Sequence, residues 1–108
     1  DFCFIENVIQ ANILAAVSSK EMSQPSIFNI AVGSQISLMD LALLIKKNLI
    51  SQNIASNFHI SNGEFRKGDI RHSLADISLA GEFLGYQPTH KVGDGLKKSM
   101  QWYLESQA

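Results

Sequence analysis

Residues 27–49, IFNIAVGSQISLMDLALLIKKNL, hold the two strongest secondary-structure signals in the chain and decide the predicted fold. Ile27–Val32 is short and apolar and is closed by Gly33, which is typical of a buried strand. Ser37 then begins a helical pattern, with Asp40 three residues further on in a relative of the capping box. The apolar positions of this helix repeat at helical spacing: Leu38, Leu41, Ala42, Ile45 and Leu49. A strand followed directly by a helix predicts a fold that mixes the two.

The sequence before this stretch predicts one more strand and one more helix. Asp1–Phe4 places two aromatic residues on one face at a period of two, as a short strand does. From Ile5 to Val17 the apolar residues return every three or four positions, which predicts a helix. Ser18–Ser26 is polar and contains Pro25, so we expect a loop there.

The sequence after residue 49 continues to alternate between predicted strands and predicted helices. Phe58–Ile60 is a third predicted strand, and Asp76 is a predicted N-cap for a short helix that ends before Gly85. A last helix is predicted from Val92 to Tyr103. We therefore expect an α/β fold in one domain, residues 1–108, with a small mixed sheet and about four helices.

Composition excludes several classes of function. Nine basic residues balance ten acidic ones, a net charge of −1, which predicts neither a nucleic-acid partner nor an anionic membrane surface. Apolar runs of five residues are too short to span a bilayer, and no signal peptide is recognisable. Cys3 is the one cysteine, and no Cys/His spacing suits a metal. We expect a cytoplasmic protein without a metal, and the apolar start after Asp1 suggests a piece of a longer chain.

The stretch Phe65-Arg66-Lys67-Gly68-Asp69-Ile70-Arg71-His72-Ser73 gathers cations and a carboxylate around a glycine. An arginine can bind a phosphate through two hydrogen bonds, and an aspartate can accept both hydroxyls of a ribose. Gly68 would let the backbone approach a ligand closely. A nucleoside diphosphate fits this chemistry. A solvated turn held by an Arg–Asp ion pair fits it too, and the residues alone leave both interpretations open.

Several motifs resemble the NAD-dependent nucleotide-sugar epimerases and dehydratases, the extended short-chain dehydrogenase/reductase family. They run in order through the chain: Asp1-Phe2-Cys3-Phe4-Ile5-Glu6-Asn7, Phe28-Asn29-Ile30-Ala31-Val32-Gly33, Arg66-Lys67-Gly68-Asp69-Ile70-Arg71-His72-Ser73, Ala75-Asp76-Ile77-Ser78, Leu84-Gly85-Tyr86, and Gly95-Leu96-Lys97 to Trp102-Tyr103. The first stretch and Arg71-His72-Ser73 are most similar to UDP-N-acetylglucosamine 4-epimerases. Related dehydratases and decarboxylases share much of the pattern, and a non-enzymatic ligand-binding or interaction module is the alternative from another class.

The resemblance implies roles for three residues. Arg66 matches the arginine that holds the UDP diphosphate, Asp69 matches the carboxylate that binds the ribose hydroxyls, and Arg71 is a further candidate for a phosphate contact. The family's Gly-rich NAD loop and its Tyr-x-x-x-Lys pair have no counterpart here. The resemblance thus implies a C-terminal UDP-sugar-binding portion of a Rossmann-type enzyme, without catalytic residues or a cofactor of its own. Its expected partners are the N-terminal NAD-binding Rossmann domain and a second copy through self-association.

Overall fold

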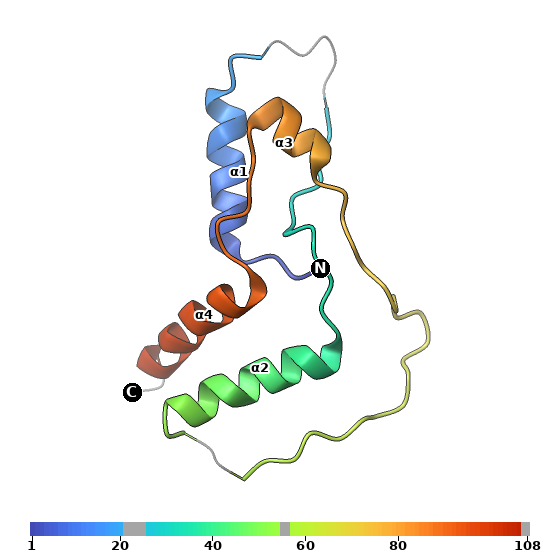
Figure 1. Ribbon diagram of the computed structural model, residues 1–108, viewed down its shortest axis with the longest axis vertical. Coiled ribbons are helices and arrows are strands. Elements are labelled where there is room, and N and C mark those ends of the chain that lie inside the picture. The colour runs from blue at the N-terminus through green and yellow to red at the C-terminus, as the bar shows by residue number, and fades with distance from the viewer. Residues whose placement is uncertain (21–25, 55–56, 107–108) are drawn as a thin grey trace.

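The computed structural model describes residues 1–20, 26–54 and 57–106. Figure 1 shows its helices in chain order: α1 (Ile5–Val17), α2 (Leu38–Ser51), α3 (Ser78–Leu84) and α4 (Val92–Ser106). Each was predicted from the sequence, and α1 packs beside α3 while α2 packs beside α4. The middle of the predicted loop Ser18–Ser26 lies outside the described residues.

The predicted mixed sheet was wrong, because the described part of the chain is all helical and contains no strand. A strand is stable only when a neighbouring strand pairs with its backbone. Here side chains take that place: the Asp1 carboxylate accepts hydrogen bonds from the amides of Val32 and Gly33, both at 3.0 Å. Lys46 of α2 likewise donates to the carbonyl of Phe58 at 3.1 Å. The three predicted strands are therefore irregular segments held by single side chains.

The predicted caps of α2 and α3 are found, one of them displaced. Ser37 Oγ accepts a hydrogen bond from the amide of Asp40 at 3.0 Å, so α2 begins as the sequence indicates. In α3 the capping position is taken by Ile77. Asp76, one residue earlier, accepts from the Ser78 hydroxyl at 2.6 Å and from the Ser78 amide at 2.9 Å. These bonds hold the pKa of the Asp76 carboxyl below its usual value, and the bond from the Ser78 hydroxyl contributes most.

Tyr86 is the centre of a small core between α1 and α3. Its side chain is 2% exposed, and its hydroxyl donates to the carbonyl of Ala31 at 2.7 Å. The core cluster consists of Ala11, Ala80, Leu84 and Tyr86. Tyr86 thus connects the segment after α3 to the segment before α2, while burial raises the pKa of its phenol to about 12.

Asn7 joins α1 to the start of α4. The side chain is completely buried, and its Oδ1 accepts hydrogen bonds from the amides of Thr89 and His90 at 2.9 and 3.0 Å. Its Nδ2 donates to the carbonyl of His90 at 2.8 Å. Close by, a Cβ on Gly95 would lie 2.7 Å from Cβ of Phe4, so only glycine lets α4 come this near.

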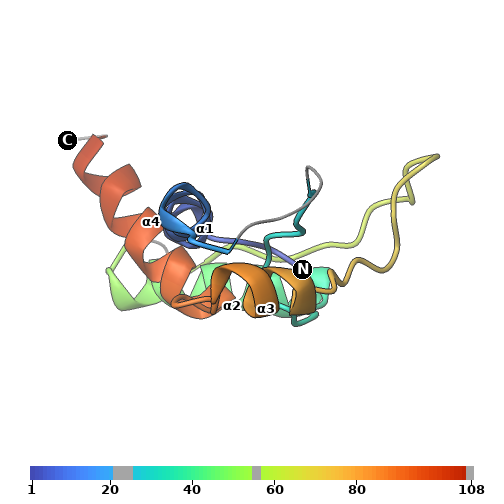
Figure 2. The ribbon, with the colours of Figure 1, turned by 90° about the horizontal axis from the view of Figure 1, so that it is seen from above.

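The molecule is a flat plate, and its accessible surface is larger than that of a compact monomer of the same mass. Its extents are 56 × 36 × 18 Å, and Figure 2 shows the plate on edge. The radius of gyration is 17.2 Å, whereas a compact domain of this length has about 13 Å. The accessible surface is 8627 Å², against about 5,900 Å² for a compact monomer of this mass. The chain is therefore more open than a compact domain of its length. No helix in the described segments has the length and apolarity needed to cross a bilayer.

Candidate functional site

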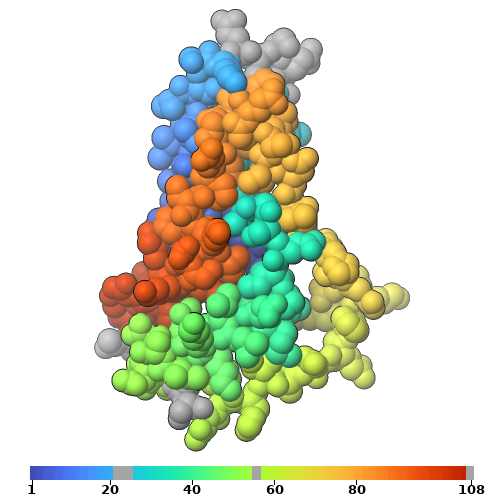
Figure 3. Space-filling model, in the orientation of Figure 1, coloured from blue at the N-terminus to red at the C-terminus, as the bar shows by residue number. Residues whose placement is uncertain are grey.

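A cavity of about 650 Å³ lies between the start of α2 and the loop that precedes α3. This volume is in the range of small-molecule sites. Figure 3 shows the loop as the outer edge of the plate beside α2. Residues from three parts of the chain line the cavity: Asp1, Phe2, Gln35, Ile36, Ser37, Leu38, Asp40, Phe65, Asp69, Ile70, Arg71, His72 and Ser73.

The structure places two of the three predicted binding residues in the cavity wall. Asp69 and Arg71 line the cavity, whereas Arg66 lies in the same loop but does not. The Arg66 carbonyl accepts a hydrogen bond from the Asp69 amide at 3.3 Å, which closes a turn through Gly68. Gly68 has a φ of 90°, a conformation that favours glycine, so the loop needs this residue to reverse.

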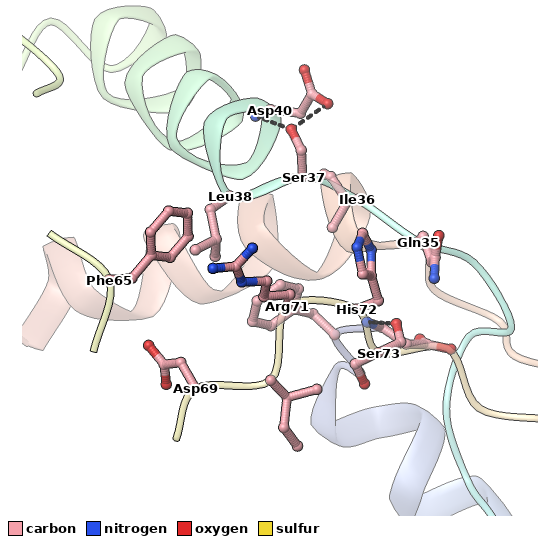
Figure 4. A pocket seen from close by; sticks show the side chains of 13 residues that line it. Gln35, Ile36, Ser37, Leu38, Asp40, Phe65, Asp69, Arg71, His72 and Ser73 are labelled. Atoms are coloured by element: carbon pink, nitrogen blue, oxygen red, sulfur yellow. Dashed lines mark hydrogen bonds between the residues drawn. The ribbon is translucent and has the colours of Figure 1, made fainter. Parts of the chain in front are cut away.

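Arg71 is held by an aromatic ring. Its guanidinium lies 4.5 Å from the ring centroid of Phe65, in a cation–π contact. Figure 4 shows the Arg71 guanidinium pointing toward Phe65 and Leu38, with Asp69 further away on the same loop. Phe65 is itself 82% exposed. A cation–π contact of this kind attracts the guanidinium through its face and does not use its N–H groups.

Within the described residues, the charged residues of this loop have no ion-pair partner. Among the residues that the structure describes, Glu6 makes both ion pairs, with Lys98 at 2.8 Å and with His90 at 3.3 Å. The Arg–Asp ion pair of the alternative interpretation, a solvated turn, is therefore not formed. Positions 61–74 are all exposed, so Asp69 and Arg71 face solvent and are open to a ligand.

Two other carboxylates at the cavity are already engaged. Asp1 accepts from the amides of Val32 and Gly33, and Asp40 accepts from the Ser37 hydroxyl at 2.6 Å. Ser37 also occupies the first turn of α2, so that helix end is capped by the chain itself. Arg71 and Asp69 remain as the cation and the carboxylate that a ligand can use. No group of three His, Cys, Asp or Glu residues that could hold a metal ion gathers in the described segments.

The sequence interpretation missed the roles of Phe65 and Asp1. Phe65 could have been found as the aromatic residue of an otherwise polar loop that also carries arginines. No sequence signal predicts the Asp1 contacts, because they join residues about 30 positions apart.

Comparison with known proteins places the chain among distant relatives of the nucleotide-sugar epimerases, enzymes of the extended short-chain dehydrogenase/reductase family. UDP-glucuronate 4-epimerase 4 of Arabidopsis thaliana is 32% identical over 96% of this chain and 25% of its own length. UDP-glucuronate 4-epimerase 3 of the same plant is 30% identical over 96% of the chain and 26% of its length. The dTDP-L-rhamnose 4-epimerase of Burkholderia thailandensis is 29% identical over 97% of the chain and 27% of its length. No family model matches. The chain spans about a quarter of the length of these relatives.

Proposed function

We propose that this chain is the nucleotide-sugar-binding segment of an NAD-dependent 4-epimerase, and that the loop at 65–73 binds the nucleoside diphosphate. One observation carries the proposal: Asp69 and Arg71 line one cavity and have no ion-pair partner in the described chain. In this role Arg71 donates to phosphate oxygens and Asp69 accepts from the ribose hydroxyls. Arg66 lies in the same loop but does not line the cavity, and we propose it as a second phosphate ligand on the resemblance alone.

The role of the segment in the reaction is binding and orientation. When the nucleotide part of the substrate is held, its binding energy helps to position the sugar, which reacts outside this segment. We expect the segment itself to hold no NAD, because its sequence has no counterpart of the family's glycine-rich loop. The NAD site and the acid–base pair would belong to a Rossmann domain outside residues 1–108.

We further propose UDP-N-acetylglucosamine as the sugar nucleotide. The resemblance of residues 1–7 and of Arg71-His72-Ser73 supports this choice. On this proposal, UDP-N-acetylglucosamine is expected to bind this chain more tightly than UDP-glucuronate does.

Titration calorimetry of the 108-residue chain with UDP tests the diphosphate site. Arg71→Ala is expected to weaken UDP binding by about 10- to 100-fold, the cost of losing a charge-assisted hydrogen bond. The binding of uridine, which has no phosphate, should change little in the Arg71→Ala chain. Lys67→Ala removes a charge from the same loop but not from the cavity wall, and serves as the matched control. If the Arg71→Ala and Lys67→Ala chains bind UDP equally well, the cavity is not the diphosphate site.

Phe65 is expected to act through Arg71. Phe65→Leu keeps an apolar side chain but removes the ring, so it should weaken UDP binding about 2- to 5-fold, in line with an exposed cation–π contact. Phe65→Tyr keeps the ring and should retain affinity. In the Arg71→Ala background, Phe65→Leu should have no further effect on the dissociation constant. An equal effect of Phe65→Leu in both backgrounds would mean that the ring contacts the ligand directly.

A further inference from the structure

Asp1 is the point where three separate parts of the chain meet. Its Oδ1 accepts a hydrogen bond from the Val32 amide and its Oδ2 accepts one from the Gly33 amide, both at 3.0 Å. Oδ2 also accepts from the amide of Ala75 at 3.4 Å, and the Asp1 nitrogen donates to the carbonyl of Ser73 at 2.8 Å. One residue thus joins the segment before α2 to the end of the loop that lines the cavity.

The attachment of this loop depends on Asp1. Positions 61–74 are all exposed, so no buried side chain anchors the loop. Within the described residues, the hydrogen bonds that join this stretch and Ala75 to the rest of the chain are the two that Asp1 makes. The contact of Arg71 with Phe65 is internal to the loop and gives its shape, but it does not attach the loop to the rest of the molecule.

The attachment lies close to the arginine that the cavity offers to a phosphate. Arg71 and Ser73 lie on one stretch of the loop (Figure 4). Two residues of extended chain span at most about 7 Å, so holding the Ser73 carbonyl restricts where the Arg71 guanidinium can lie. A loop that is already in place loses less conformational freedom when a ligand arrives, and it therefore binds that ligand more tightly.

The charge of Asp1 gives it a second, opposite effect. Its carboxylate lines the same cavity, and a negative charge there repels a diphosphate. Removing the carboxylate would therefore strengthen UDP binding if Asp1 were only part of the wall, and weaken it if Asp1 holds the loop. We propose that Asp1 is a positioning residue of the diphosphate site, which keeps the loop where Arg71 reaches a phosphate. This proposal rests on the proposed function of the loop.

Titration calorimetry of the Asp1→Ala chain with UDP tests the proposal. The change removes the charge and all three carboxylate hydrogen bonds, and UDP binding is expected to weaken about 3- to 10-fold. Asp40→Ala is the matched control. It removes the same charge from the same cavity wall, but the Asp40 carboxylate is bound by Ser37 at the start of α2 and does not hold the loop. This control should bind UDP as tightly as the parent or more tightly.

Asp1→Glu separates position from charge. It keeps the carboxylate but places it one methylene further from the backbone, away from the three amides. UDP binding should weaken here too, whereas a residue that acts through charge alone would show no change. In the Arg71→Ala background, Asp1→Ala should have a smaller effect, because the guanidinium that it positions is gone. Hydrogen exchange at Val32 and Ala75 should be faster in Asp1→Ala, while the amides inside α1 keep their rates.

The Arg71→Ala chain distinguishes two kinds of failure. If the parent does not bind UDP, or if Arg71→Ala binds it as tightly as the parent, the proposed function is wrong and the positioning role with it. If Arg71→Ala weakens binding but Asp1→Ala binds as tightly as the parent or more tightly, only the positioning role is wrong. It is also wrong if Asp1→Ala and Asp40→Ala weaken binding equally, or if Asp1→Ala loses its helical circular dichroism, because Asp1 would then act on the fold as a whole.

Discussion

Replacing Tyr86 with alanine is expected to unfold the α1–α3 half of the molecule. Among the residues that the structure describes, Tyr86 is one of four in the buried core cluster and the one aromatic side chain in it. Truncating a buried aromatic residue costs about 3–5 kcal/mol. A chain whose core is this small has little stability to spare. The variant should lose much of its helical circular dichroism at 25 °C, and its urea transition should vanish or move to far lower concentration.

Tyr86→Phe separates the hydrogen bond from the packing. It keeps the ring and removes only the bond to the Ala31 carbonyl, so it should cost about 1 kcal/mol in the free energy of unfolding. The parent and Tyr86→Phe should also differ in how their stability changes at high pH. Because the folded pKa is about 12 and an unfolded tyrosine titrates near 10, the parent gains stability from this group below pH 10 and loses it as the pH rises to 12. Tyr86→Phe should lack that loss, and equal alkaline destabilisation of both proteins would contradict the assignment.

The helices could be predicted from the sequence because the signals for them are local. Apolar residues at helical spacing, Ser37 at the start of α2 and Gly85 at the end of α3 act within a few residues of each other. The sheet could not be judged in this way, because a strand depends on a partner elsewhere in the chain. Ile27–Val32 has the composition of a strand, yet the amide of its last residue is bound by the Asp1 carboxylate.

The sequence also did not predict which face of α1 is buried. A helix with isoleucines along one side and Ala11 and Leu14 along the other offers two candidates, and periodicity favours the row of larger side chains. The structure buries the smaller row, because Asn7 lies on it and finds partners only near Thr89 and His90. The binding loop shows the reverse case. The kind of ligand could be predicted from Arg66, Asp69 and Arg71 in the sequence alone. Only the fold shows that Asp69 and Arg71 line the cavity and that Arg66 does not.

Asn7→Ala is expected to detach the start of α4 from α1. The Asn7 side chain is fully buried, and its loss leaves the amides of Thr89 and His90 without their acceptor. Thr89 is exposed and His90 is half-buried, so water reaches the freed amides in part, and the variant should lower the free energy of unfolding by about 1–3 kcal/mol. Hydrogen exchange gives the specific readout, because the amides of Thr89 and His90 should exchange much faster while those inside α2 keep their rates.

Asn12→Ala is the matched control for this experiment. Asn12 lies on the same helix, but it is exposed and its amide donates only to the Val8 carbonyl within α1. Since alanine is the better helix former, this variant should be as stable as the parent or slightly more so. If Asn7→Ala and Asn12→Ala had the same small effect on unfolding and on exchange at Thr89 and His90, the side chain of Asn7 would not connect the two helices. A large effect confined to Asn7→Ala would show that one buried amide side chain sets how α4 docks, beyond the Glu6–Lys98 ion pair and the contact of Gly95 with Phe4.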